Sequence, residues 1–164
     1  MEAMLSRADG RWVLRFERVL PHGCEKVWRA LTDPSELSHW FPANVEGARR
    51  TGAVLRFLDR DGGDTTHGHV TALRSKEVFE YTWVDALLRW ELGPEGEGCR
   101  LVFTHSFYDS ATAARDAAGW ESSLDRLGRW LLGAPVAFDP ARWENAFERY
   151  VNALTLMAGP QQGA

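Results

Sequence analysis

His105 is the residue of this sequence whose type and setting best suit acid–base chemistry. It lies in the run CRLVFTHSF, residues 99–107, where alternate positions share one face of a strand, so we expect it beside Leu101 and Phe103. An inward histidine of this kind is suited to moving a proton in an enolisation or a dehydration. The same face carries no carboxylate, and a histidine alone among apolar residues is more often a hydrogen-bonded structural group. We therefore predict no catalytic residue and favour a binding protein over an enzyme.

Two further histidines have a spacing that metal sites use. His67 and His69 are two positions apart on one strand face, and Asp61 and Asp64 precede them in a loop. This set resembles half of a metal site, yet the sequence supplies no further ligands at a fixed spacing. The glycines of the loop, in DGGD (61–64), do not open a helix and so do not favour a phosphate cradle. We predict neither a metal nor a cofactor.

The two cysteines offer a third kind of chemistry. Cys24 and Cys99 lie far apart in the chain, and two such residues form neither a disulfide framework nor a metal ribbon. Cys24 precedes a short helix, where a thiolate is favoured, although a packed and inert thiol is the commoner outcome. We expect free thiols and, with them, a cytoplasmic location.

Composition excludes two classes of partner. The 164 residues contain 19 Lys and Arg against 23 Asp and Glu, a net charge of −4, without a long basic run, so we predict no nucleic-acid partner. No apolar run approaches the ~20 residues of a membrane span. The hydrophobic share is 45%, with eight tryptophans and eight phenylalanines, which indicates a large aromatic interior or an interior with a cavity.

The elements that must position these residues change type along the chain. A strand is predicted at 12–20, and two short helices follow at 25–33 and 34–41. The apolar pattern then changes to alternation, which predicts antiparallel strands joined by short turns at 43–47, 53–58, 67–73, 77–83, 87–92 and 99–107.

Two helices close the chain. An apolar stripe of about five turns runs through 112–132 and ends at Gly133, and Asp139 caps a last helix that begins at Pro140. Element order and type predict an α+β fold in which a curved antiparallel sheet wraps around the long helix. We divide the chain into an N-terminal segment (1–11), a domain (12–132), an added helix that packs on the same domain (133–158) and a frayed tail (159–164).

The alternating strands and the long helix direct many aromatic rings to one interior. A helix does not fill a concave sheet along its whole length, so we expect an apolar cavity between them, with Tyr81 and His105 as its polar contacts. A solid aromatic core is the alternative. The predicted ligand-binding wall consists of Trp40, Phe57, Tyr81, Trp83, Trp90, Phe103, His105, Trp120 and Leu124.

The last helix carries a second apolar stripe. Trp143, Phe147, Tyr150 or Val151, and Leu154 recur at helical spacing. Such a stripe serves a homodimer face or a partner surface in some proteins, but packing back on its own domain is the default expectation.

Several motifs in the right order resemble one family. They are EKVWRALTDPSELSHWF (25–41), Gly52, Gly68-His69-Val70, Tyr81-Thr82-Trp83, Leu101 to His105, and Gly119-Trp120. Together they make the chain similar to the START-like (SRPBCC, helix-grip) superfamily, in the branch homologous to activators of heat-shock protein 90 ATPase. The resemblance implies a seven-stranded antiparallel sheet that grips a long C-terminal helix, with an apolar tunnel between them.

Members of that superfamily differ in function, and include lipid and hormone carriers, polyketide cyclases and chaperone activators. The resemblance does not include the separate N-terminal domain of the eukaryotic chaperone activators, so a chaperone is the less favoured partner. We expect a small cytoplasmic protein that binds an apolar or aromatic molecule between sheet and long helix. The alternatives are a chaperone-directed protein–protein role and an enzyme of the cyclase or dehydratase type that uses His105 in the same pocket.

Overall fold

Alternating apolar and polar residues build one antiparallel sheet in the computed structural model, which describes residues 3–158. The tail predicted to fray, 159–164, lies outside the described residues. The eight strands lie in the order β1-β2-β8-β7-β6-β5-β4-β3. Their bounds are β1 (Met4–Ala8), β2 (Arg11–Leu20), β3 (Asn44–Glu46), β4 (Val54–Leu58), β5 (Thr65–Arg74), β6 (Val78–Trp83), β7 (Ala86–Glu95) and β8 (Gly98–Phe107).

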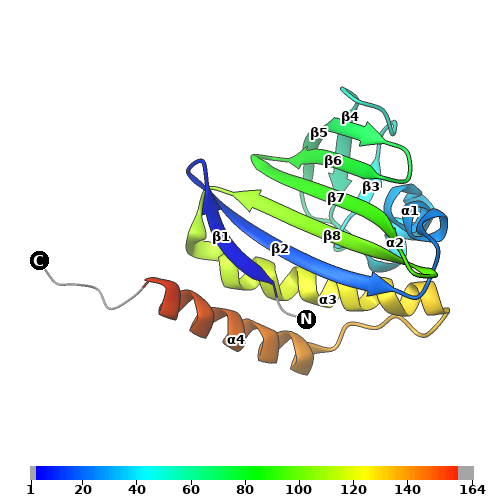
Figure 1. Cartoon of the computed structure of the whole chain (residues 1–164). Helices are drawn as coiled ribbons and strands as arrows, with labels where there is room; N and C mark the ends of the chain where they lie inside the picture. Colours follow the sequence, from blue (N-terminus) through cyan, green and yellow to red (C-terminus); the bar gives the residue numbers. More distant parts are fainter. Residues whose placement is uncertain (1–2, 159–164) are drawn as a thin grey trace, which may run out of the picture.

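The helices segregate to the concave side of this sheet (Figure 1). They are α1 (Cys24–Thr32), α2 (Pro34–Trp40), α3 (Ala113–Leu132) and α4 (Pro140–Ala158), with a 3-10 turn, η1 (Ser110–Thr112), before α3. Figure 1 shows α3 lying under the curved sheet, α1 and α2 beside one end of it, and α4 along the far side of α3. The predicted α+β helix-grip fold is confirmed.

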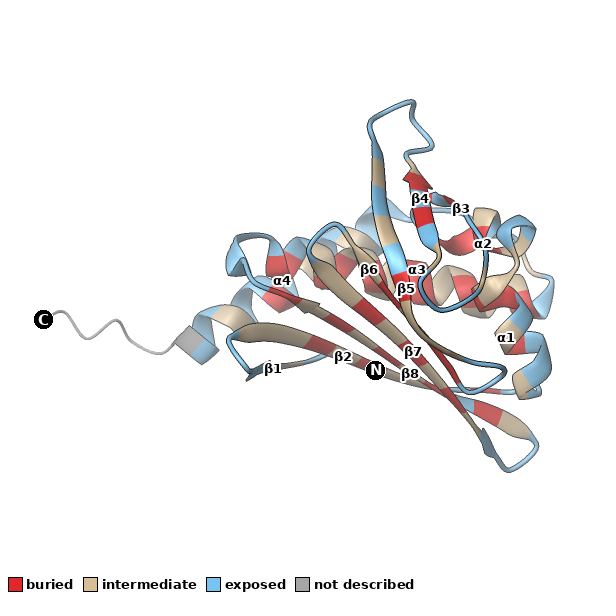
Figure 2. Cartoon of the chain, turned by 90° about the horizontal axis from the view of Figure 1, so that it is seen from above, coloured by how far each residue is buried: buried red, intermediate tan, exposed pale blue. Residues whose placement is uncertain are grey.

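The strand faces follow the predicted alternation. Along β7, Leu88, Trp90 and Leu92 are buried, and the intervening Arg89 forms ion pairs of 2.9 Å with Glu80 and 2.6 Å with Glu91. Along β8 the buried residues likewise alternate with less buried ones, as Figure 2 shows. The charged face therefore lies away from the helices, and the aromatic face lies over α3.

The long helix begins and ends where the sequence predicts. Its apolar stripe is buried from Ala113 to Leu131, and Gly133 ends it with a φ of 71°, a left-handed conformation that glycine adopts without a steric penalty. The carboxylate of Asp139 accepts the backbone N–H of Ala141 at 3.1 Å, which caps α4 as predicted. None of the described helices is long and apolar enough to cross a bilayer.

An edge strand was not predicted. β1 pairs with β2 through a hairpin in which Asp9 and Gly10 have positive φ angles of 52° and 77°. This strand brings the sheet to eight strands, one more than the resemblance implies. It is short and mostly exposed, so the alternation that indicates a half-buried strand is weak in it.

The prediction of free thiols is wrong. Cys24, at the start of α1, and Cys99, at the start of β8, form a disulfide across 75 residues of chain. A separation in sequence says nothing about the distance in space, and here the fold places the first turn of α1 against the sheet end where β8 begins. The cysteines therefore give no support to a cytoplasmic location, which we inferred from free thiols.

Candidate functional site

A pocket of about 430 Å³ lies between α3 and the end of the sheet where β6 turns into β7. Its apolar wall combines residues from the sheet, from α3 and from the C-terminal addition, namely Trp83, Leu88, Trp120, Phe138 and Trp143. Its polar residues are His105, Arg115, Asp116, Ser122, Ser123 and Arg126. Ring faces with a few polar groups are the usual composition of a small-molecule site.

His105 enters the pocket wall from β8 and is 7% exposed. The indole Nε1 of Trp120 donates to its Nδ1 at 3.1 Å, which leaves the proton of the neutral ring on Nε2. Burial lowers the pKa of His105 from 6.5 to about 4. At neutral pH the side chain is therefore an uncharged hydrogen-bond donor.

The two inner indoles of the pocket present only their rings. Trp83 donates its Nε1 proton to Thr66 Oγ1 at 2.8 Å, and Trp120 donates to His105. Both N–H groups are satisfied within the protein, and each ring contacts further aromatic rings behind it. The wall that these residues form is therefore apolar and held in place.

Two charged residues of α3 mark different parts of the pocket. Burial raises the pKa of Asp116, whose carboxylate accepts a hydrogen bond of 3.0 Å from Thr112 Oγ1. Arg126 donates from one terminal nitrogen to Ser123 Oγ at 3.2 Å, while its buried Nε has no hydrogen-bond partner among residues 3–158. Burial, and then the charge of Arg60, lower the pKa of Arg126.

The turn between β6 and β7 forms part of the mouth. Val84 lines the pocket with 63% of its surface exposed, and its φ is 56°. A β-branched residue is unfavourable in this left-handed region, which glycine or asparagine would occupy at lower cost. Backbone outliers of this kind often lie at functional sites, so the turn is consistent with a binding role.

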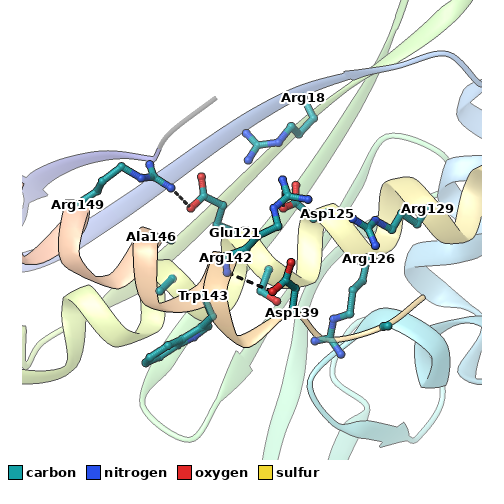
Figure 3. Close-up of a pocket in the computed structure, with 13 residues that line it drawn as sticks. Arg18, Glu121, Asp125, Arg126, Arg129, Asp139, Arg142, Trp143, Ala146 and Arg149 are labelled. Carbon is teal, nitrogen blue, oxygen red and sulfur yellow. Dashed lines mark hydrogen bonds and ion pairs between the residues drawn. The ribbon is translucent and has the colours of Figure 1, made fainter. Parts of the chain in front are cut away.

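A second hollow, of about 140 Å³, lies between α3 and α4 and is lined mainly by charged groups (Figure 3). Arg142 pairs with Asp125 at 3.2 Å, and Arg149 pairs with Glu121 at 2.9 Å. These pairs join the two helices across the hollow. We therefore interpret it as part of the contact that holds α4 on α3, and the larger apolar pocket as the candidate site.

The structure divides the nine residues of the predicted wall into two groups. Trp83, His105 and Trp120 line the pocket. The other six are buried in the core beside it and do not line it, namely Trp40, Phe57, Tyr81, Trp90, Phe103 and Leu124.

Ring contacts fill the space between those core residues. Trp90 stacks on Phe103 with ring centroids 3.9 Å apart, and Phe57 stacks on Trp83 at 4.5 Å. The hydroxyl of Tyr81, which we expected to contact a ligand, instead accepts the indole N–H of Trp90 at 3.1 Å. Burial raises the pKa of Tyr81.

Sequence reasoning missed the residues that the C-terminal addition and the polar side of α3 supply. Phe138 lies alone in the breaker-rich segment before α4, and Trp143 was assigned only to the stripe of the last helix. Arg126 lies off the apolar stripe of α3, a position that is typical of a solvent-facing residue. An isolated aromatic residue beside a helix cap was the available signal for Phe138.

The other candidate sites lie apart from the pocket. His67 and His69 are exposed on β5, and His69 Nδ1 lies 3.1 Å from Thr82 Oγ1. Within residues 3–158 no three His, Cys, Asp or Glu side chains are grouped closely enough to hold a metal ion.

Comparison with solved structures supports the fold. A conserved protein of unknown function, EF2215 from Enterococcus faecalis, is 21% identical, with 94% of this chain and 91% of that chain covered and a TM-score of 0.77. CalU16 from Micromonospora echinospora is also 21% identical, with coverages of 94% and 98% and a TM-score of 0.74. DynU16, from the dynemicin biosynthetic locus, is 26% identical over 77% of this chain and 50% of that chain, with a TM-score of 0.66.

None of the curated proteins compared with the chain matches it. A family model does match, and it spans residues 22–131, from the start of α1 to the end of α3. That span contains the core of the helix-grip fold and both indoles of the inner pocket wall, and it confirms the resemblance seen in the sequence. The chain belongs to the family of Activator of Hsp90 ATPase homolog 1-like proteins.

Proposed function

We propose that the protein binds an apolar or aromatic small molecule in the pocket between α3 and the β6–β7 end of the sheet. The observation that carries the proposal is the pocket itself, about 430 Å³ with Trp83, Trp120 and Trp143 in its wall. This volume falls within the ~300–1,000 Å³ that small-molecule sites occupy. Hydrogen bonds within the protein hold Trp83 and Trp120 of the wall in place, which lowers the cost of ordering on binding.

The state of His105 supports binding over catalysis. A histidine with a pKa of about 4 is a weak base, and its Nδ1 already accepts the Trp120 indole proton. The ring therefore acts as a fixed donor through Nε2, which suits recognition of a carbonyl or hydroxyl oxygen. An enzyme of the cyclase or dehydratase type requires His105 to exchange a proton, which the buried, hydrogen-bonded ring does poorly.

The family description supports a second candidate, stimulation of a chaperone ATPase. That role needs a protein-binding surface and makes no use of the pocket. Chaperone ATPase rates measured with and without this protein test it directly. Stimulation that persists in a variant with a blocked pocket would favour the protein–protein role over ligand binding.

Tryptophan indole N–H signals in a 15N–1H NMR spectrum offer a direct test of ligand binding. The probe is naphthalene carboxamide, a neutral aromatic molecule. We expect saturable shifts of the Trp83, Trp120 and Trp143 signals and little change at Trp90, whose ring is 1% exposed in the core.

Trp143→Ala should weaken binding of the probe by about tenfold, because it removes one ring of the wall. Trp12→Ala is the matched control, since Trp12 is a half-buried tryptophan on β2 and does not line the pocket. Absence of saturable shifts with the carboxamide and also with its anionic counterpart, naphthalene carboxylate, or equal effects of the two substitutions, would refute the proposed pocket.

A further inference from the structure

We propose that the ligand of this pocket carries an anionic group, in the simplest case a carboxylate on an aromatic or apolar body, and that Arg126 binds it. The inference rests on the proposed function and names its ligand class. It starts from a charged side chain that lines a pocket with an aromatic wall and that the protein itself leaves incompletely partnered.

Arg126 has no acidic partner among residues 3–158. Its Nε is buried without a hydrogen bond, and a terminal nitrogen donates to the neutral Ser123 Oγ. The charge that most affects it is another cation, Arg60, whose guanidinium donates to the backbone carbonyls of Leu37 and Phe41. Two cations of this kind attract an anion to this part of the pocket.

A shortage of acidic residues does not explain this arrangement. Asp125 immediately precedes Arg126 on α3, yet its carboxylate pairs with Arg142 of α4 at 3.2 Å. Figure 3 shows Arg126 pointing away from that pair. Arg142 and Arg149 of the α3–α4 contact are thus each paired with a carboxylate, whereas Arg126, which lines the larger pocket, has none among residues 3–158.

The chemistry of the guanidinium narrows the ligand class. Its fork of N–H donors matches a carboxylate, and a charge-assisted hydrogen bond is stronger than one between neutral groups. A partly buried cation with a bare N–H destabilises the ligand-free protein, and an anionic group would remove that cost. The rings of Trp83, Trp120 and Trp143 would then hold the apolar body.

Asp116 gives the ligand a direction. It lines the same pocket ten residues before Arg126 on α3, which is about 15 Å along the helix axis. An anionic group near Asp116 would face that carboxylate as well as the cation Arg115, whereas the same group near Arg126 would meet a cation that has no acidic partner among residues 3–158. The acidic end of the ligand therefore belongs at Arg126, and a hydroxyl or amine suits the Asp116 end.

The test compares two probes of nearly the same shape, naphthalene carboxylate and naphthalene carboxamide, by calorimetry and by the indole N–H spectrum. Arg126→Gln should weaken the carboxylate by at least about tenfold, the loss expected for a charge-assisted hydrogen bond, and change the carboxamide by less than about twofold. Arg129→Gln is the matched control, because Arg129 lies on the same helix but lines only the smaller hollow. It should affect neither probe.

The outcomes separate this inference from the proposed function. Equal affinity of wild type and Arg126→Gln for the carboxylate would overturn the inference, even if both probes bind. Failure of both probes to bind the wild type would overturn the proposed function and the inference with it. Preference of the wild type for the carboxamide over the carboxylate would overturn the inference alone.

A stability measurement guards against a merely structural effect. Because the Arg126 guanidinium lacks a partner for Nε, Arg126→Gln should melt at or above the wild-type temperature without ligand. Arg126→Lys keeps the charge without the fork and should give intermediate carboxylate affinity. A large loss of thermal stability in both variants would show that Arg126 holds the fold instead and would contradict the proposal.

Discussion

Aromatic residues line both ends of the space between the sheet and α3, but side chains fill one end and leave a pocket at the other. At the closed end, α2 places Trp40 and Phe41 over the sheet, and Trp40 meets Trp90 edge-on with centroids 5.6 Å apart. At the open end, the cover comes from Phe138 and Trp143, and a pocket of about 430 Å³ remains beneath it.

The covering segments explain the difference. α2 is short, capped by Asp33 and packed directly on the core, so its last residue, Trp40, and the following residue, Phe41, are fully buried. The segment that bears Phe138 has no helix or strand, and Phe138 remains 54% exposed. Aromatic residues on a sheet therefore become core or pocket wall according to what packs on them.

Removal of Trp90 should have the largest effect on stability. Trp90→Ala removes a ring that is 1% exposed and stacked on Phe103 at 3.9 Å, so the free energy of unfolding should fall by roughly 3–5 kcal/mol. Trp143→Ala, at the half-buried pocket rim, should cost about 1 kcal/mol or less. Chemical denaturation measures both, and equal losses would show that the two ends do not differ as described.

Acidification should have the next largest effect on the free energy of unfolding. The unfolded chain protonates His105 near pH 6.5, whereas the folded chain does so near pH 4. The stabilisation that comes from burying His105 as a neutral ring is therefore fully present above pH 6.5. It is lost as the pH falls towards 4, by about 3 kcal/mol in total.

The variant His105→Asn isolates that contribution. Its amide oxygen can accept the Trp120 N–H in place of Nδ1, and it does not titrate. The fall in stability between pH 6.5 and 4 should be shallower in the variant by the same amount. Parallel curves for wild type and variant would mean that His105 is not the buried neutral group described here.

A small gain in stability is expected at the pocket mouth. Val84→Asn relieves a β-branched residue at a φ of 56°, so the variant should be more stable by about 1 kcal/mol. It should also bind an aromatic probe a few-fold more weakly, because an apolar side chain of the mouth is replaced by a polar one. A gain in stability without a loss of affinity would remove Val84 from the binding surface.

Most of the fold could be predicted because its signals are local. Alternation in 77–83 and 87–92 identified β6 and β7, and Gly133 and Asp139 marked the boundaries of α3 and α4. β1 was not predicted because it is short and mostly exposed. The disulfide of Cys24 and Cys99 was not predicted, because disulfide pairing depends on the distance between two cysteines in space, which their spacing in the sequence does not give.

The candidate site was less predictable than the fold. Period-two alternation correctly directs Trp83, Trp90 and His105 to one face, but it does not say which of them a neighbouring segment will cover. Arg126 lies off the apolar stripe of its helix, and the sequence pattern therefore predicts a side chain that faces solvent. Only the packing of the C-terminal addition, through Phe138 and Trp143, makes it part of a pocket.

By itself the sequence determined every α-helix and every strand except β1, the faces of the strands and the family, because each depends on residue periodicity and on motifs that lie within short stretches. The tertiary structure alone decided where the aromatic interior is solid and where it is open. That outcome depends on contacts among α2, α3 and the segment before α4, which lie far apart in the chain. Cavity position is a property of how surfaces fit together, and no local pattern encodes it.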